Sequence, residues 1–381
     1  MQKISKPLIA CSLLIVLAGF KADKTKITTP KIAQQKIQVA ILLDVSSSMD
    51  GLIDQAKAQL WNMVNTLGKV QCSNSATPQI EIALYEYGRS SNSVKDGYVK
   101  RINDFTTSLD SLSQNLFSLH TNGGDEYCGQ VIYTSLQQLK WDEGADNYKV
   151  VFIAGNEDFL QGKLHYITAC NLAKQKGVIV NTIYCGDKQT GIAEHWNLQS
   201  ECGTGTFTNI DANAKTEDIP TPYDSAIYSY NFKLNGTFVA YGANASYNYS
   251  NVARQDELNV SNSKAAGIKR IKSKANAKVY KNSTWDLVDA KSDDKEFVKK
   301  IDKKQLPDSL KNKTTAEIEK IIDDKQKERA AIQQKIVELN KQRDEYIVKN
   351  TIKNAANTQT LETEIEKIIK TQVQKFKMTV Q

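Results

Sequence analysis

Residues 37–211 alternate strand-like and helix-like segments, and this alternation limits the possible folds more than any other feature of the sequence. The expected strands are 37–44, 80–87, 98–105, 149–154, 178–184 and 205–210. The expected helices are 51–68, 109–119, 126–141 and 166–176, where apolar residues recur every three or four positions. The near-continuous apolar run at 149–154 is typical of a central parallel strand buried on both faces. We therefore predict an α/β fold with a doubly wound, mainly parallel sheet and helices on both faces.

The loop after the first expected strand has the pattern Asp44-x-Ser46-x-Ser48. One carboxylate and two hydroxyls at alternate positions supply the hard oxygen ligands that Mg²⁺ and Ca²⁺ prefer. Ligand sites of open α/β sheets lie beyond the carboxyl ends of the strands, which is where this loop falls. The pattern therefore predicts a site for a divalent cation, with Mg²⁺, Mn²⁺ or Ca²⁺ as the ion.

Between its apolar strand and the following helix, this motif resembles the metal-ion-dependent adhesion site of the von Willebrand factor A (VWA) domain. The resemblance covers residues 36–213. It implies a domain that binds one cation at the upper face of its sheet, where a carboxylate of a partner completes the coordination. Ser46 and Ser48 would bind the ion directly, and Asp44 directly or through water. Two further loops would contribute a Thr after Gly-Gly and an Asp in a Thr-Asp-Gly turn.

Both of those loops depart from the VWA pattern. In the second loop, residues 121–126 with the sequence TNGGDE, Asp125 stands in place of the usual Thr. A charged oxygen ligand raises the affinity for a dication and shifts the preference toward Ca²⁺ or Mn²⁺. The third loop has Gly155 at the position of the expected Asp. The expected ligands are Asp44, Ser46, Ser48 and Asp125, and the further candidates are Glu126, Asn156, Glu157 and Asp158. The alternative is a degenerate site, in which Ser and Asp only satisfy backbone groups of the turn.

Residues 1–24 have the features of an export signal, with Lys3 and Lys6 before an apolar segment at 8–20 that is too short for a permanent membrane span. An uncleaved N-terminal anchor is the alternative. Cleavage would leave five of the six cysteines, so at least one would be unpaired in an oxidising compartment. We expect one or two disulfides, with Cys185 and Cys202 as candidates. With its Lys-, Asn- and Ile-rich composition, the chain is expected to be a bacterial protein of the periplasm, the cell surface or the medium.

The composition changes after residue 213. Residues 214–263 are rich in Tyr, Asn and Ser, and we expect them to form a peripheral arm. Residues 264–381 are rich in Lys, Glu and Gln and are expected to be helical. Between 318 and 346, four- and three-residue steps form a heptad seam in which three of nine positions are charged. The seam could lie against the arm, form a hairpin with an apolar stripe at 361–376, or form a parallel coiled-coil dimer through which the chain self-associates.

Composition and motifs exclude several functions. The net charge of +7, from 50 basic and 43 acidic residues, carries no nucleic-acid signature. Neither a phosphate-binding Gly-rich loop nor a Gly-x-Ser-x-Gly elbow occurs, and the three histidines lack the spacing of a zinc motif, so we expect no enzyme. The Asn-x-Ser/Thr sequences that begin at Asn235, Asn244, Asn248 and Asn282 match the glycosylation pattern, which an Asn-rich chain also produces by chance.

The sequence thus predicts an exported VWA-domain protein that binds a protein or glycan partner, presenting a carboxylate, through a divalent cation. One alternative is a structural component of a cell-envelope assembly with a degenerate metal site. Another is a metal-dependent hydrolase or its accessory, in which Glu126 or Glu157 would act as the base toward a metal-bound water.

Overall fold

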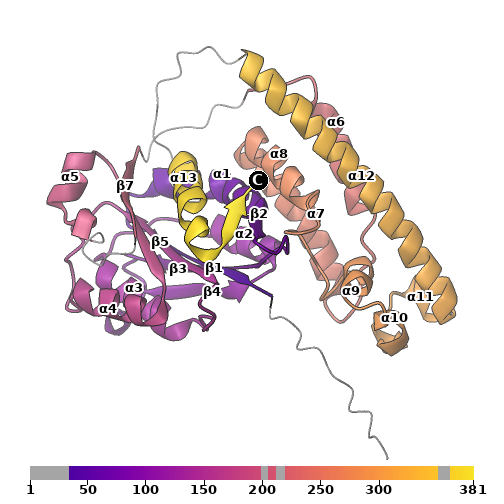
Figure 1. The fold of residues 1–381 in the computed structure, drawn as a ribbon, viewed down its shortest axis with the longest axis horizontal. Helices are drawn as coiled ribbons and strands as arrows, with labels where there is room; N and C mark the ends of the chain where they lie inside the picture. The colour runs from indigo at the N-terminus through magenta and orange to yellow at the C-terminus, as the bar shows by residue number, and fades with distance from the viewer. Residues whose placement is uncertain (1–33, 199–204, 212–218, 351–360) are drawn as a thin grey trace, which may run out of the picture. The chain divides into compact units, whose positions relative to one another are not determined.

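The computed structural model describes residues 34–198, 205–211, 219–350 and 361–381 (Figure 1). The expected export signal at 1–24 and Cys202 lie outside the described residues. Within the described ranges, no helix combines the length and the apolarity needed to cross a membrane.

A six-stranded sheet runs through residues 34–211, with the strand order β4-β3-β1-β5-β6-β7. Its strands are β1 (Lys36–Asp44), β3 (Gln79–Tyr87), β4 (Lys100–Thr106), β5 (Tyr148–Gly155), β6 (Ile179–Cys185) and β7 (Phe207–Ile210). Neighbouring strands are parallel except β3 and β4, which pair antiparallel. Because the winding direction changes at β1, the sheet is doubly wound. The predicted α/β fold class is confirmed.

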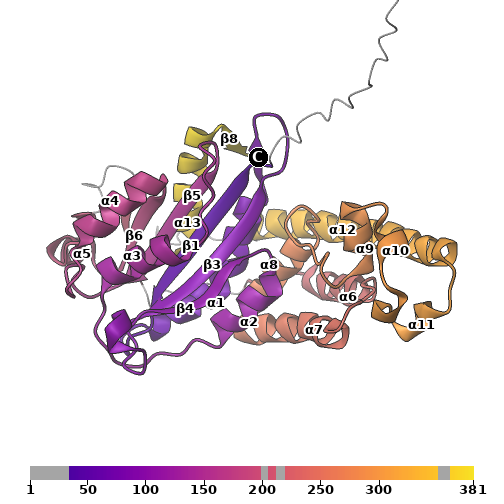
Figure 2. The same ribbon diagram turned by 90° about the horizontal axis from the view of Figure 1, so that it is seen from below.

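Helices cover both faces of this sheet, as Figure 2 shows. The helices of this part are α1 (Asp50–Leu67), α2 (Leu109–Phe117), α3 (Cys128–Gln138), α4 (Tyr166–Lys176) and α5 (Lys188–Ala193), with a short 3₁₀ helix η1 (Val94–Asp96). Val39 and Leu43 of β1 share one core with α1 and α2, whereas Ala40 and Leu42 share another with α3 and α4. This alternation is the two-residue period of a strand buried on both faces.

Residues 219–350, which we call the helical insert, follow β7 in the chain. Their elements are α6 (Asp224–Asn235), α7 (Ala245–Asn262), α8 (Lys264–Lys274), α9 (Leu287–Asp293), α10 (Phe297–Lys300), η3 (Lys303–Gln305), α11 (Asp308–Lys311) and α12 (Thr315–Asn350). Thr314 and Glu317 form the capping box expected at the start of α12, since the Thr314 N–H donates to Glu317 Oε2 at 2.8 Å.

The heptad seam of α12 is buried within the chain. Ile332, Ile336 and Leu339 pack in one core with residues of α6 and α8, and Ile318 and Ile322 pack with residues of α9. Helix α12 therefore lies against α6, which belongs to the expected arm. The structure shows no hairpin between this helix and the described part of 361–376. A parallel dimer through the same seam would first require the insert to open, because the seam side chains are already covered.

The last described segment returns to the α/β domain. It contains α13 (Leu361–Gln372), η4 (Val373–Phe376) and β8 (Met378–Val380), which pairs antiparallel with β2 (Val70–Cys72). Leu361, Ile369 and Val373 are buried in the same core as α1. The α/β domain thus includes residues 361–381 as well as 34–211, whereas the sequence assigned 361–381 to the charged helical region.

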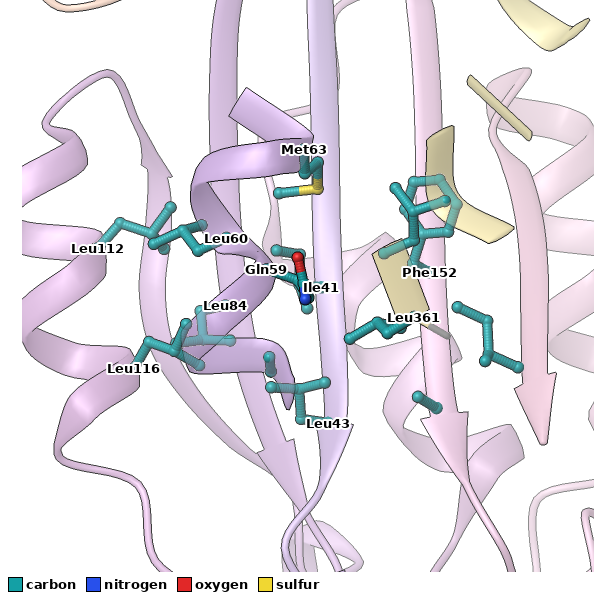
Figure 3. Close-up of a pocket in the computed structure, with 14 residues that line it drawn as sticks. Ile41, Leu43, Gln59, Leu60, Met63, Leu84, Leu112, Leu116, Phe152 and Leu361 are labelled. Carbon is teal, nitrogen blue, oxygen red and sulfur yellow. The ribbon is translucent and has the colours of Figure 1, made fainter. Parts of the chain in front are cut away.

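An apolar cavity of about 40 Å³ lies between the sheet, α1, α2 and α13. Figure 3 shows Ile41 of β1 between Leu116 of α2 on one side and Leu361 of α13 on the other. A cavity with such an apolar lining offers a water molecule few hydrogen-bond partners. It belongs to the packed core on which α13 closes.

Candidate metal centre

The Asp44 loop lies at the carboxyl edge of the sheet, where several loops meet. In register, Asp44 is paired with Tyr87 of β3, and Leu43 with Ala154 of β5, so the three strands end side by side. The loop before α3 is joined to them by two backbone bonds: the Asn122 N–H donates to Val45 O at 2.9 Å, and the Ser90 N–H donates to Gly123 O at 2.7 Å. The predicted motif and the second predicted loop are therefore brought together.

Asp44, Ser46 and Ser48 form the core of this site. The Ser46 N–H donates to Asp44 Oδ1 at 2.7 Å, and the Ser46 and Ser48 Oγ atoms are 3.3 Å apart. Asp44 is 0% exposed, and its second carboxylate oxygen, Oδ2, has no hydrogen-bond partner among the described residues. A buried carboxylate oxygen without a donor is costly, and a bound cation would satisfy it.

Glu126 supplies a second buried carboxylate to the same place. A Cβ atom at Gly88 would lie 2.8 Å from Asp44 Oδ1 and 2.8 Å from Glu126 Cγ, so both side chains border this glycine, whose φ is +80°. Burial raises the pKa of Asp44 to about 7, although the Ser46 N–H opposes the rise. Burial also raises the pKa of Glu126 to about 8, and the charges of Asp44 and Glu157 add to this rise. Two such carboxylates repel each other when ionised, and a cation between them would relieve the repulsion.

Asp125, the residue predicted as the fourth ligand, lies differently. It is exposed, and its Oδ2 accepts a hydrogen bond from the Tyr127 hydroxyl at 3.1 Å. Glu126, its neighbour in sequence, is buried beside Asp44 instead. The structure therefore favours Glu126 over Asp125 as the carboxylate ligand from this loop.

The third loop shows why no carboxylate occurs at position 155. A Cβ atom at Gly155 would lie 2.5 Å from Tyr87 Oη and 3.0 Å from Asp44 Oδ2, so an Asp side chain has no space there. The Tyr87 hydroxyl fills this position and donates to Ala154 O at 3.0 Å. The next residue, Asn156, reaches the site, since its Oδ1 accepts from the Ser48 hydroxyl at 3.3 Å.

The other candidates of the third loop, Glu157 and Asp158, are less buried than Asp44 and Glu126. Asp158 Oδ1 lies 3.0 Å from His195 Nδ1, and both side chains are partly exposed. Glu157 is exposed, but its charge contributes to the raised pKa of Asp44 and Glu126. Its backbone oxygen accepts from the buried Trp196 indole at 2.8 Å. No local pattern in the sequence around Trp196 indicates this anchoring role.

Cys185 is wrong as a disulfide candidate, because it is a free thiol buried at the end of β6. The other candidate, Cys202, lies outside the described residues. Among the described cysteines, Cys170 of α4 is disulfide-bonded. Cys128 lies beneath the candidate centre, with its Sγ 3.9 Å from Tyr87 Oη. It is free and fully buried, and burial raises the pKa of its thiol well above the usual range, so it is a core residue.

The donor set fits a small, hard cation. No cluster of three His, Cys, Asp or Glu side chains arranged for metal binding occurs in the part of the chain that the structure describes. The centre instead combines two carboxylates, two hydroxyls and an amide oxygen from Asp44, Glu126, Ser46, Ser48 and Asn156. Oxygen donors of this kind suit Mg²⁺, Mn²⁺ and Ca²⁺. Fold and site together define a doubly wound α/β domain with an Asp-x-Ser-x-Ser loop and a buried carboxylate pair at its carboxyl edge.

No protein-family model matches the chain, and a comparison with curated protein sequences found no match. Among solved structures, the chain is similar to a von Willebrand factor type A protein from Catenulispora acidiphila, with 15% identity and a TM-score of 0.34. It is also similar to the SpRpn10 VWA domain, with 17% identity and a TM-score of 0.34. A third similar structure is proximal thread matrix protein 1 from the mussel byssus with a zinc-occupied MIDAS motif, with 13% identity and a TM-score of 0.35.

Each of these similarities covers 46% of this chain. They cover 39%, 88% and 42% of the other chains, respectively. The chain therefore spans less than half of the Catenulispora protein and of the mussel protein.

Proposed function

We propose that this chain is an exported VWA-type protein that binds a protein or glycan partner through a divalent cation. The ion is held by Asp44, Ser46, Ser48 and Glu126. The observation that carries the proposal is the Asp44 Oδ2 atom, which is buried without a hydrogen-bond partner among the described residues. The Asp44 side chain lies beside Ser46, whose N–H donates to Asp44 Oδ1, and it borders the second buried carboxylate, Glu126, at Gly88. A divalent cation supplies the positive charge that this group of oxygens lacks.

The exposure of the ligands supports binding of a partner from one side. Asp44, Ser46 and Glu126 are buried, whereas Ser48 and its neighbour Ser47 are exposed. A ligand atom from outside therefore reaches the site on the side of Ser48. We propose that this atom is a carboxylate oxygen of the partner, because a hard cation prefers charged oxygen ligands.

The chain's own residues have distinct tasks in this proposal. The Ser46 N–H orients Asp44, and the Ser48 hydroxyl is oriented by Asn156. Glu126 comes from a different loop, so its coordination would link the loop after β1 to the loop before α3. The remaining exposed residues around these loops would contact the partner.

The test is calorimetric titration of Mn²⁺ into the chain without its first 24 residues. Asp44→Ala is compared with the wild type and with Asp125→Ala, a matched change to an exposed carboxylate of the same edge. We expect one Mn²⁺ to bind to the wild type and to Asp125→Ala, and none to Asp44→Ala. Equal heats from the wild type and Asp44→Ala, or no heat from the wild type, would contradict the proposed cation site.

The partner's carboxylate is tested separately on the Mn²⁺-loaded chain. Water-proton relaxation reports the water molecules bound to Mn²⁺, and acetate is added as the carboxylate probe with acetamide as the neutral control. We expect acetate, but not acetamide, to lower the relaxation enhancement by displacing water. If both are without effect while Mn²⁺ remains bound, the ion is structural and the bridging role is wrong.

A further inference from the structure

A second candidate site lies at the opposite end of the central strands from Asp44. It is a pocket of about 440 Å³, a size in the range of small-molecule sites. Its lining includes Lys149, the second residue of β5, together with Val178 and Ile179 at the start of β6. Because β1, β5 and β6 are parallel, the starts of β5 and β6 lie at the edge away from the loop that follows β1. The end of α4 and Phe376 of η4 complete the lining.

Lys149 brings a buried positive charge to this pocket. The residue is 6% exposed, and its Nζ donates to two backbone oxygens, Asp142 O at 2.8 Å and Lys176 O at 2.6 Å. Among the described residues no carboxylate forms an ion pair with this ammonium, and the Asp142 carboxylate is paired with Lys36 instead, at 3.4 Å. An ammonium has three donors, so one N–H remains for a further acceptor. A buried charge is costly unless it is paired, and an anionic ligand would pair it.

The Nζ atom of Lys149 borders open space in the pocket. Gly177, which follows α4, is exposed and lines the pocket. A Cβ atom added to Gly177 would meet Lys149 Nζ at 3.6 Å and Lys149 Cε at 3.9 Å, and no other described side chain lies within 4 Å of that position. The space beside Gly177 is therefore free, and a ligand atom placed there contacts Nζ directly.

The rest of the lining is apolar or basic. Ala145, Ala173 and Phe376 contribute apolar surface. The other two charged lining residues, Lys174 and Lys375, are exposed and form no ion pair with a described residue, and no described Asp or Glu lines the pocket. Burial lowers the pKa of Lys149, and the charge of Asp142 only partly opposes this effect. Apolar walls with three lysines and no carboxylate are complementary to a ligand that has an apolar body and a negative group.

We propose that this pocket binds a medium-chain fatty acid. Its carboxylate accepts from Lys149 Nζ, and its alkyl chain lies against the apolar walls. A carboxylate suits this pocket better than a phosphate, because only one N–H of the buried ammonium is free. The proposal is independent of the cation site, since the two sites lie at opposite ends of the strands.

The experiment uses the chain without its first 24 residues and octanoate as the probe. The matched ligands are 1-octanol, which has the chain without the charge, and acetate, which has the charge without the chain. Inorganic phosphate is a third comparison. Saturation-transfer NMR detects binding, and calorimetry gives the Kd. All measurements contain EDTA, so that octanoate cannot bind through a metal ion at the Asp44 site.

Two variants change the pocket in different ways. Lys149→Met removes the ammonium and keeps the length of the side chain, and Lys188→Met, at an exposed position of α5, is its control. Ala145→Trp fills the pocket from an exposed lining position and leaves Lys149 in place. Its control is Ala330→Trp, at an exposed position of α12. Circular dichroism reports folding, and if Lys149→Met does not fold, Ala145→Trp decides.

We expect octanoate to bind to the wild type and to both control variants, and 1-octanol, acetate and phosphate to bind at least about tenfold more weakly. Lys149→Met should raise the Kd of octanoate by about tenfold or more, because a hydrogen bond to a charged group is lost. Ala145→Trp should raise it by at least as much. No binding of octanoate, equally tight binding of any matched ligand, or a wild-type Kd in either folded pocket variant would overturn the proposal.

Discussion

Arg270 Nη1 lies 2.7 Å from Asp110 Oδ1, and this buried ion pair joins α8 of the helical insert to α2 of the α/β domain. Arg270 is 0% exposed and also lies 4.8 Å from the centre of the Trp61 ring. The pair is thus part of the interface that fixes the insert on the domain.

Replacing Asp110 by Ala should lower the free energy of unfolding by about 3–5 kcal/mol, because it leaves the buried guanidinium without one of its carboxylates. Urea denaturation followed by circular dichroism measures the loss. The control is Lys335→Ala, which breaks an exposed pair with Glu338 and should cost less than about 1 kcal/mol. Equal losses of unfolding free energy in the two variants would show that the buried Arg270–Asp110 pair stabilises the fold no more than an exposed ion pair does.

Glu126→Gln should weaken Mn²⁺ binding by at least about tenfold, because it removes one of two carboxylates from the proposed coordination shell. Asp125→Asn, one residue earlier, should leave the Kd within about threefold of the wild type, since Asp125 is exposed and bonded to Tyr127. Calorimetry on both variants distinguishes the two neighbours. If Asp125→Asn had the larger effect, the loop would bind the ion in the way that the sequence alone predicts.

These two neighbours show how far the sequence could predict the site. Asp44, Ser46 and Ser48 were predictable because they form one short motif on one turn. The choice between Asp125 and Glu126 depends on the path of their loop, which is fixed by the bond from the Ser90 N–H to Gly123 O. That contact joins segments more than thirty residues apart, so no local pattern reports it.

The fold was predictable to a similar extent. The six strands of the main sheet and the helices α1 to α4 carry local periodicity, and their types were predicted correctly, whereas the short helix α5 was not predicted. The short strand β2 was missed because its partner, β8, lies at the other end of the chain. The same holds for α13, whose many charges indicated a helix of the basic tail. Only tertiary packing shows that its apolar face completes the core of the α/β domain.

Leu361→Ala in α13 should therefore destabilise the α/β domain by about 2–5 kcal/mol, since it enlarges a core that already contains a cavity. Lys367→Ala, at an exposed position of the same helix, is the control and should change stability by less than about 0.5 kcal/mol. The measurement is urea denaturation followed by tryptophan fluorescence. A wild-type midpoint for Leu361→Ala would mean that α13 is dispensable for the domain.

Gly155→Asp should not create the ligand that the VWA pattern lacks here. The new Cβ would collide with the Tyr87 hydroxyl, and the new carboxylate would lie beside Asp44. We expect a loss of at least about 2 kcal/mol in the free energy of unfolding and no gain in Mn²⁺ affinity. Combining Gly155→Ala with Tyr87→Phe should recover part of the stability lost in Gly155→Ala alone, because the double variant lacks the colliding hydroxyl. A tighter Kd in Gly155→Asp would contradict this account of the loop.

Asp256 of α7 lies between two buried cations, with its carboxylate 2.6 Å from Arg270 Nε and 2.8 Å from Lys274 Nζ. Burial alone would raise the pKa of Asp256, but Lys274 and Arg270 outweigh it and hold this pKa well below its usual range. The unfolded chain binds a proton at this group near pH 4, whereas the folded chain does not. The stabilisation is therefore fully present above about pH 4 and is lost as the pH falls further.

Asp256→Asn should reduce the free energy of unfolding by about 3 kcal/mol at pH 7, because both cations lose their shared carboxylate. The difference from the wild type should become smaller below about pH 4, because there the unfolded wild type binds a proton at Asp256 whereas the folded wild type does not, and this proton uptake stabilises the unfolded state. Urea denaturation at pH 7, 5, 4 and 3 follows the difference. Asp308→Asn, which changes a carboxylate that is 93% exposed and paired with Lys311, is the control and should track the wild type at each pH. A difference for Asp256→Asn that stays constant from pH 7 to pH 3 would show that the pKa of Asp256 is not lowered by folding.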